Sequence, residues 1–316
     1  MAHVSVITPT YNDAQSVSRA IHSVLGQTYD DHEHVIVDDA STDDTARILG
    51  QYDDGRIKTV TRETNGGLAA ARNDGIREAE GEYVIFLDAD DEFLPETIET
   101  LVDRIEAGEW VAVCPSQLWI WKDGTTEVDP APPKTITKDD LRSDGMHVVG
   151  GVGGLLVESQ VLEDIGSFDE NLRYLEDYDI CLRLVEENTL RGTDEILYLY
   201  HRGYEGQLTT HKDEHRHERR KFLKKNRERL SNHHRSKHYY RLTHEHAAAG
   251  EMDDAMKNLT DAIGAYPFRL PYYYYLPPVV VGHHAYSVAS KAHKATKRGV
   301  LSMLPERLRD DAVENR

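Results

Sequence analysis

The first hundred residues alternate between short apolar runs and amphipathic segments, and this alternation constrains the fold more than any other feature. The apolar runs predict strands at residues 3–9, 34–37, 57–61 and 83–87, and the segments between them predict helices at 14–25, 41–52 and 66–79. Strands that alternate with helices form a mostly parallel sheet covered on both faces. We therefore expect an α/β fold with a Rossmann-like, mixed and mostly parallel sheet.

Polar residues follow three of these strands at the point where each one ends. They are Pro9-Thr10-Tyr11-Asn12, Asp38-Asp39 and Asp88-Ala89-Asp90-Asp91. In open α/β sheets, ligands bind beyond the carboxyl ends of the strands. The sequence therefore predicts a ligand site at this edge of the sheet.

Several of these side chains have both a functional and a structural explanation. Asp88 and Asp90 offer hard oxygen ligands, which suit Mg²⁺ or Mn²⁺ bound together with phosphate oxygens, or they are acids that favour a helix N-terminus. Asp39 accepts from a nucleobase N–H or a ribose hydroxyl, or it caps the next helix. Arg72 counters a pyrophosphate, or it forms a surface ion pair. The residues alone leave these alternatives open.

The charge is distributed unevenly along the chain, whose net charge is −19. Residues 1–210 hold 16 Lys and Arg against 43 Asp and Glu, a net charge of −27, whereas residues 211–241 hold 12 against 4, a net charge of +8. A body this acidic argues against a nucleic-acid partner. Adaptation to a salt-rich, halophilic cytoplasm is one explanation, and an ordinary acidic surface is the other.

The ordered set of motifs resembles the family 2 glycosyltransferases of the inverting GT-A type. The motifs, spread over residues 3–205, are VSVITPTYN (4–12), VDDASTDDT (37–45), NGGLAAARN (65–73), FLDADD (86–91), GSFDE (166–170) and EDYDI (176–180). The resemblance implies the GT-A fold and a transferase that uses a nucleotide-activated sugar.

The resemblance also implies a role for each matching residue. Pro9, Thr10 and Tyr11 match the loop along the nucleoside, and Asp39 matches the contact to a uridine-type base. Arg72 matches a residue near the base and phosphates. Asp88 and Asp90 match the DXD pair that binds the donor, with Asp90 as the ligand of Mn²⁺ or Mg²⁺. Asp177 matches the catalytic base, which takes the proton of the acceptor hydroxyl as the new bond forms. Glu176 is its neighbour.

The last third of the chain differs in composition, so we place the end of the catalytic domain at residue 210 and a helical extension at 211–316. Residues 211–241 predict a basic helix, which either meets an anionic membrane or packs on the acidic body. Residues 239–267 resemble one tetratricopeptide-type helix pair. Residues 270–289 are aromatic and aliphatic, which suits either a membrane interface or a packed strap.

Together these observations predict a glycosyltransferase of glycan biosynthesis, protein glycosylation included. It would transfer a sugar from a nucleotide-sugar donor, UDP-sugar favoured, to a glycan or lipid-linked acceptor. The alternatives are a polyprenyl-phosphate sugar synthase and a non-catalytic sugar-nucleotide-binding scaffold. We expect a cytoplasmic protein without a signal peptide or transmembrane helix, with peripheral contact to the inner face of the cell membrane as an option. The sequence leaves the sugar, the acceptor and the oligomeric state open.

Overall fold

The computed structural model describes residues 2–108, 110–145, 148–203, 212–287 and 289–290. The chain divides into two compact units, residues 1–230 and 231–316. The sequence analysis placed its boundary at residue 210, whereas the first unit continues to residue 230 and includes the basic helix α8 (Lys212–Lys225). Residues 291–316 of the predicted extension lie outside the described ranges.

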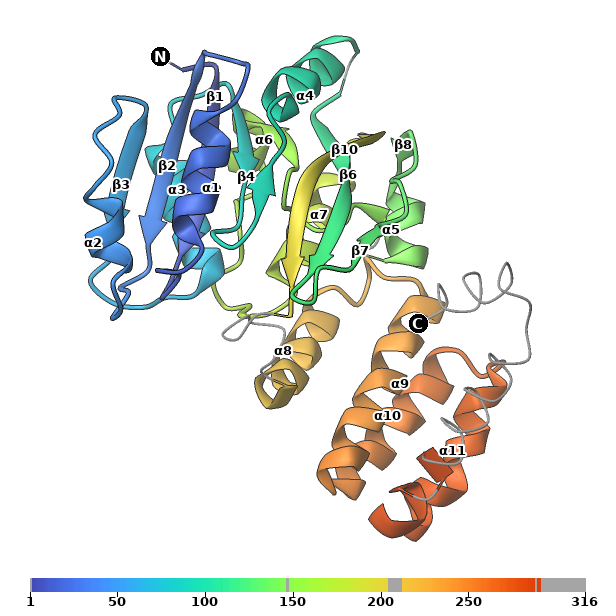
Figure 1. Ribbon diagram of the computed structural model, residues 1–316. Helices are drawn as coiled ribbons and strands as arrows, with labels where there is room; N and C mark the ends of the chain where they lie inside the picture. Colours follow the sequence, from blue (N-terminus) through green and yellow to red (C-terminus); the bar gives the residue numbers. More distant parts are fainter. Residues whose placement is uncertain (1, 109, 146–147, 204–211, 288, 291–316) are drawn as a thin grey trace. The chain divides into compact units, whose positions relative to one another are not determined.

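The first unit contains a ten-stranded mixed sheet (Figure 1). Its main strand order is β3-β2-β1-β4-β9-β6-β10-β5, and the two remaining strands pair at its side, β7 with β6 and β8 with β10. Its strands are β1 (Val4–Thr10), β2 (His32–Asp38), β3 (Ile57–Thr61), β4 (Tyr83–Phe86), β5 (Glu92–Phe93), β6 (Ala112–Trp121), β7 (Thr126–Val128), β8 (Thr135–Ile136), β9 (Leu156–Glu158) and β10 (Leu190–Arg202). The pairs β1–β2, β2–β3, β1–β4 and β6–β10 are parallel. The mixed, mostly parallel core of the sheet is therefore as predicted.

Helices cover both faces of the sheet because the central strands are apolar on both sides. Along β2, Ile36 packs in one cluster with Val17 and Ile21 of a first helix, whereas its neighbours Val35 and Val37 pack with a helix on the opposite face. The helices of this unit besides α8 are α1 (Val17–Leu25), α2 (Thr45–Leu49), α3 (Leu68–Glu78), α4 (Thr97–Glu106), α5 (Lys138–Asp144), α6 (Ser159–Asp164) and α7 (Glu176–Leu184).

Helix α8 packs on the segment that contains α7. Packing on the acidic body was one of the two alternatives predicted for the basic stretch. The Phe222 ring stacks on Tyr178, with centroids 5.0 Å apart, and both side chains are fully buried. Glu218 accepts a hydrogen bond from the backbone N–H of Arg173 at 2.9 Å. The apolar residues of this basic helix therefore belong to the core of the first unit.

The second unit is a helical assembly of α9 (Asn232–Ala249), α10 (Met252–Ala265) and α11 (Leu270–Val281). Ser231 caps α9 by accepting from the backbone of His234 at 3.1 Å, and Gly250 ends it with a left-handed φ of 84°. Helices α9 and α10 pack against each other as the predicted helix pair. Tyr272 and Tyr275 of α11 are buried in the same cluster.

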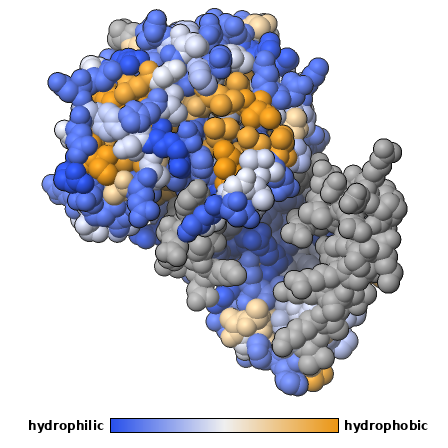
Figure 2. All heavy atoms as spheres, in the orientation of Figure 1, coloured by the Kyte–Doolittle hydropathy of each residue, from blue (hydrophilic) through white to orange (hydrophobic). Residues whose placement is uncertain are grey.

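Hydrophilic residues cover most of the face shown in Figure 2, interrupted by separate hydrophobic patches on the first unit. On the second unit, apolar side chains of α11 and the segment before it are exposed, among them Phe268, Leu270 and Val281. Over the described residues, none of the helices combines the length and the hydropathy that crossing a bilayer requires.

Candidate active site

The carboxyl ends of β1 and β2 hold the first group of predicted site residues. Pro9 and Thr10 end β1 in the interior, and Tyr11 is 46% exposed. The hydroxyl of Thr10 and the backbone N–H of Tyr11 both donate to the Asp13 carboxylate, at 3.0 and 2.9 Å. Asp13 thus fixes the loop after β1, a role that the sequence analysis missed because the residue lies outside the matched motifs.

Asp39 is buried and holds the loop that leads into α3. Its carboxylate accepts from the backbone N–H groups of Gly66 and Gly67, at 2.9 and 2.8 Å, and pairs with Arg62 at 3.2 Å. Gly67 has φ +86°, a conformation that favours glycine. Asp39 therefore positions this loop, and its predicted contact to a base stays a prediction.

Arg72 lies between the two predicted carboxylate motifs. It rises from α3 and is almost fully buried. Its guanidinium donates to Asp88 at 2.8 Å and to Glu176 at 3.0 Å. Burial opposes the charge of Arg72, but the carboxylates of Asp88 and Glu176 raise its pKa. One cation therefore joins a residue that follows β4 to a residue that begins α7, and Arg72 itself is 104 residues from Glu176 in the sequence.

The loop after β4 is held from several sides. Arg19 of α1 donates to the backbone carbonyl of Asp90 and pairs with Glu92 at 3.2 Å. The fully buried Asp91 accepts from the Tyr198 hydroxyl at 2.6 Å and from the backbone N–H of His201 at 2.8 Å. The sequence analysis named neither Asp91 nor Tyr198 as a site residue; the third acid of the DADD run was the one available signal.

Electrostatics at this loop are dominated by crowded acids. Burial raises the pKa of Asp91 well above its usual range, and the charges of Asp90 and Asp88 add to the effect. Burial also raises the pKa of Asp13 to about 6. Two hydrogen bonds oppose this rise, and the charges of nearby acids add to it. The loop after β4 therefore lies in a region where a bound cation would relieve repulsion between carboxylates.

These residues fit a divalent metal that shares its coordination with phosphate oxygens. Among the described residues, no group of three or more His, Cys, Asp or Glu side chains is placed to hold a metal ion. Mg²⁺ is commonly held by one or two carboxylates together with substrate phosphates and water. Asp88, whose side chain is 30% exposed, and the partly exposed Asp90 offer such a donor set. The crowded acids provide the independent physical reason for a cation there.

Asp177 lies in the first turn of α7, directly after Glu176. Leu175 adopts a left-handed φ of 65° just before the helix, and the Asp177 carboxylate accepts from the backbone N–H of Tyr178 at 2.7 Å. Burial raises the pKa of both Glu176 and Asp177, and the charge of Asp177 adds to the shift of Glu176. A carboxylate whose pKa lies above its usual range is better matched to accepting a proton near neutral pH.

The glycine-rich segment 150–154 approaches this carboxylate. A Cβ placed on Gly151, whose φ is +100°, would lie 3.8 Å from the Asp177 carboxylate. A Cβ on Gly153 would lie 2.7 Å from the Tyr198 ring, closer than van der Waals contact permits. Backbone without a side chain at Gly151 therefore borders the Asp177 carboxylate.

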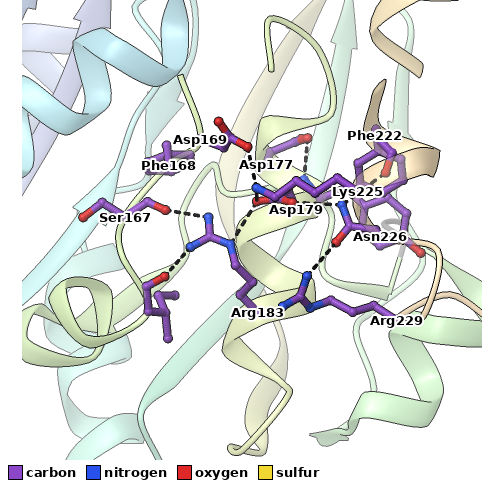
Figure 3. A network of polar contacts seen from close by, with 12 residues as sticks. Ser167, Phe168, Asp169, Asp177, Asp179, Arg183, Phe222, Lys225, Asn226 and Arg229 are labelled. Carbon is purple, nitrogen blue, oxygen red and sulfur yellow. Dashed lines mark hydrogen bonds and ion pairs between the residues drawn. The ribbon is translucent and has the colours of Figure 1, made fainter. Parts of the chain in front are cut away.

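Asp179, two residues after Asp177, faces a different set of partners (Figure 3). Its fully buried carboxylate accepts from Arg183, Lys225 and Asn226, each at 2.9 Å. Lys225 also donates to Asp169 at 2.6 Å. Lys225 at the end of α8 and Asn226 directly after it are thus fastened to the helix that carries the predicted base.

The fold is of the mixed α/β class with a mostly parallel central sheet, and comparisons with known proteins identify the family. The sequence profile described as glycosyl transferase family 2 matches residues 5–161. TuaG of Bacillus subtilis (strain 168), a glycosyltransferase that its name assigns to teichuronic acid biosynthesis, is 48% identical over 201 residues, which are 62% of this chain and 78% of TuaG. The chain therefore belongs to glycosyl transferase family 2.

Two further similarities bear on the fold and the chemistry. WfgD of Escherichia coli, named as a UDP-Glc:α-D-GlcNAc-diphosphoundecaprenol β-1,3-glucosyltransferase, is 41% identical over 102 residues, 32% of this chain and 40% of WfgD. TarS of S. aureus (residues 1–349), solved with UDP-GlcNAc, is 21% identical, covers 94% of this chain and 92% of that chain, and has a TM-score of 0.64. This likeness confirms the GT-A fold. Several other curated relatives match along only 62% of their own length.

Proposed function

We propose that this glycosyltransferase moves a sugar from a nucleotide-diphosphate donor, UDP-sugar favoured, to a glycan or lipid-linked acceptor, with inversion at the anomeric carbon. The observation that carries the proposal is the ion-pair bridge of Arg72, which joins Asp88 to Glu176. The bridge brings the donor-side loop after β4 next to Asp177. In a direct displacement, the carboxylate that orients the sugar donor and the base that takes the proton of the acceptor must lie close together.

Each residue has a defined part in this reaction. Asp177 takes the proton of the acceptor hydroxyl while its oxygen forms a bond to the anomeric carbon. The bond from that carbon to the diphosphate breaks on the opposite side, and the nucleoside diphosphate leaves with the electron pair. Asp88 orients the donor, and Asp90 holds Mn²⁺ or Mg²⁺. That ion, when bound, stabilises the negative charge of the leaving diphosphate.

The loops after β1 and β2 would bind the nucleoside. The exposed Tyr11 and the loop fixed by Asp39 lie at the carboxyl ends of neighbouring parallel strands, where such folds bind ligands. The names of WfgD and of the TarS complex, which contain UDP-sugars, support a UDP-sugar donor. The name of WfgD also supports a lipid-diphosphate-linked acceptor.

A lipid-linked acceptor would bring the protein to the cytoplasmic face of the membrane. The exposed apolar side chains at Phe268, Leu270 and Val281 support a peripheral contact of this kind. Sedimentation with anionic lipid vesicles tests it: we expect binding that weakens when Phe268 and Leu270 are both replaced by Ser. Equal binding of both proteins would contradict the membrane contact.

The decisive test of the reaction is turnover across a panel of UDP-, GDP- and dTDP-sugars. Each donor is assayed with Mn²⁺ or Mg²⁺, at low and high salt, with polyprenyl-linked lipid extract as acceptor. We expect metal-dependent transfer that Asp177→Asn reduces at least a hundredfold, as loss of a general base does. The control is Asp53→Asn, which neutralises an exposed carboxylate that follows α2. Donor binding without turnover, equal in wild type and Asp177→Asn, would instead indicate a non-catalytic scaffold.

A further inference from the structure

Three aromatic side chains and one arginine form a row along β6 and β10 that begins next to the active site. The two strands pair in parallel with Tyr200 beside Trp119 and Arg202 beside Trp121. Side chains two residues apart on a strand point to the same face, so these four residues share one side of the sheet. We call this set of four the aromatic strip.

Arg202 lies at the centre of the strip. Its guanidinium carbon is 4.1 Å from the centre of the Trp119 ring, 5.2 Å from Trp121 and 5.1 Å from Tyr200. Stacking on aromatic faces holds the planar guanidinium in place while its N–H edge stays able to donate. Within the described part of the chain, Arg202 forms no ion pair with a carboxylate, but its charge acts on the buried Asp129: burial raises the pKa of Asp129, and the charge of Arg202 lowers it.

The strip is open to a ligand. Trp119, Trp121, Tyr200 and Arg202 are all partly exposed. A protein that exposes two neighbouring indoles loses the free energy that their burial would provide. Tyr200 also packs against the buried cluster around Tyr198, which gives that ring a structural function and anchors the strip.

The next pair of residues inward connects the strip to the active site. Gln117 pairs with Tyr198 on the same face. The Tyr198 hydroxyl donates to Asp91, and the Gln117 side chain donates to the carbonyl of Gly150 at 2.9 Å. Gly151, the following residue, is the one that borders Asp177. The strip therefore begins at the glycine-rich backbone beside the proposed base.

We propose that the aromatic strip binds the acceptor, with a sugar ring against the indoles of Trp119 and Trp121 and a phosphate or carboxylate group of the same acceptor on Arg202. The inference rests on the proposed function, because it assigns the acceptor to a strip that begins at the backbone beside the proposed base Asp177. The apolar face of a sugar ring packs well on an indole. The fork of an arginine matches the two oxygens of a phosphate or carboxylate.

The shared chemistry, a sugar ring next to an anionic group, has two sources. One is the diphosphate of a lipid-linked sugar, and the other is a uronic acid within a glycan. A strongly acidic first unit would repel either anion, so an arginine at the entrance supplies a local attraction.

Intrinsic tryptophan fluorescence reports on the strip directly. The chain has three tryptophans, at 110, 119 and 121, so Trp110→Phe leaves only the two in the strip as emitters. In this background, with UDP and Mn²⁺ present to fill the donor site, we would titrate glucose 1-phosphate, methyl β-glucuronide and neutral methyl β-glucoside. We expect saturable quenching by at least one anionic probe and at least tenfold weaker binding of the neutral glucoside.

Variants then assign the binding to the strip. We expect Arg202→Gln to weaken the anionic probe about tenfold or more, the loss of a charge-assisted hydrogen bond, and Arg202→Lys to lose less. Which anionic probe binds identifies the source of the charge. Absence of saturable quenching by every probe, or equal dissociation constants in wild type and Arg202→Gln, would overturn the proposal.

Kinetics separate this proposal from the proposed function. With the donor and acceptor that turn over, we expect Trp119→Ala and Arg202→Gln to raise the KM for acceptor by a larger factor than the KM for donor. Equal factors for both substrates would overturn the strip as an acceptor site. If the wild type binds the anionic probes at the strip but transfers no sugar from any donor, the proposed function fails while the binding site stands.

Discussion

Removing the Asp179 carboxylate would test how firmly α8 is fastened to the helix that carries Asp177. In Asp179→Ala, three donors lose a shared acceptor whose side chain is fully buried (Figure 3). Removing one partner of a buried ion pair costs about 3–5 kcal/mol, because the other charge stays buried without its counter-ion.

The contacts that remain place the expected loss at the lower end of that range. Arg183 keeps hydrogen bonds to the carbonyls of Ile165 and Ser167, and Lys225 keeps its bond to Asp169 and is 32% exposed. We therefore expect the free energy of unfolding to fall by about 3 kcal/mol. For a unit of this size, that corresponds to a decrease in Tm of about 6–12 °C.

Thermal unfolding followed by tryptophan fluorescence reports on the first structural unit, because all three tryptophans lie within residues 1–230. The second unit unfolds without contributing an indole signal, which avoids assuming one transition for the whole chain. The matched control is Arg104→Ala, which breaks an exposed pair with Glu195 and should cost less than about 1 kcal/mol. A loss in Asp179→Ala no larger than in this control would refute the reasoning.

Four further predictions concern the site. Arg72→Ala should reduce kcat/KM at least a hundredfold and also lower Tm, because it leaves two facing carboxylates without their cation; wild-type turnover would contradict the bridge. Burial raises the pKa of Asp129 to about 6, so stability should fall as the pH rises from about 4 to 6, and Asp129→Asn should flatten this fall in urea titrations. Chelation of the metal should weaken UDP binding, measured calorimetrically, in wild type but hardly in Asp90→Ala. Gly153→Ala should cost about 1–3 kcal/mol in urea unfolding, because its Cβ would overlap the Tyr198 ring.

The parallel core of the fold was predictable because its signals are local. Runs such as VSVITP and YVIFL are apolar without interruption, which is typical of strands buried on both faces. The later strands were harder to predict, since β9 inserts antiparallel between β4 and β6 and β10 runs for 13 residues with irregular register. Their pairing depends on contacts far apart in sequence, which periodicity does not encode.

In the candidate site, too, local motifs were predictable and long-range contacts were not. Asp88, Asp90 and Asp177 were recognisable from motifs, whereas the bridge of Arg72 between two of these motifs depends on tertiary geometry. The predicted single basic helix at 211–241 is interrupted before Ser231, an N-cap that a charge count does not reveal. The apolar side chains of this stretch, Phe222, Leu223 and Leu230, are all buried, which the excess of positive charge does not indicate.

The packing of α8 limits where the protein can be truncated at its C-terminal side. The matched family profile ends at residue 161 and the last recognisable motif ends near residue 180, so neither argues against a stop codon after residue 210. Such a fragment would lose the Phe222 ring that stacks on Tyr178, and the Lys225 and Asn226 side chains that donate hydrogen bonds to Asp179. We expect it to be recovered mainly in inclusion bodies, whereas a fragment that continues to residue 230 should stay in the supernatant.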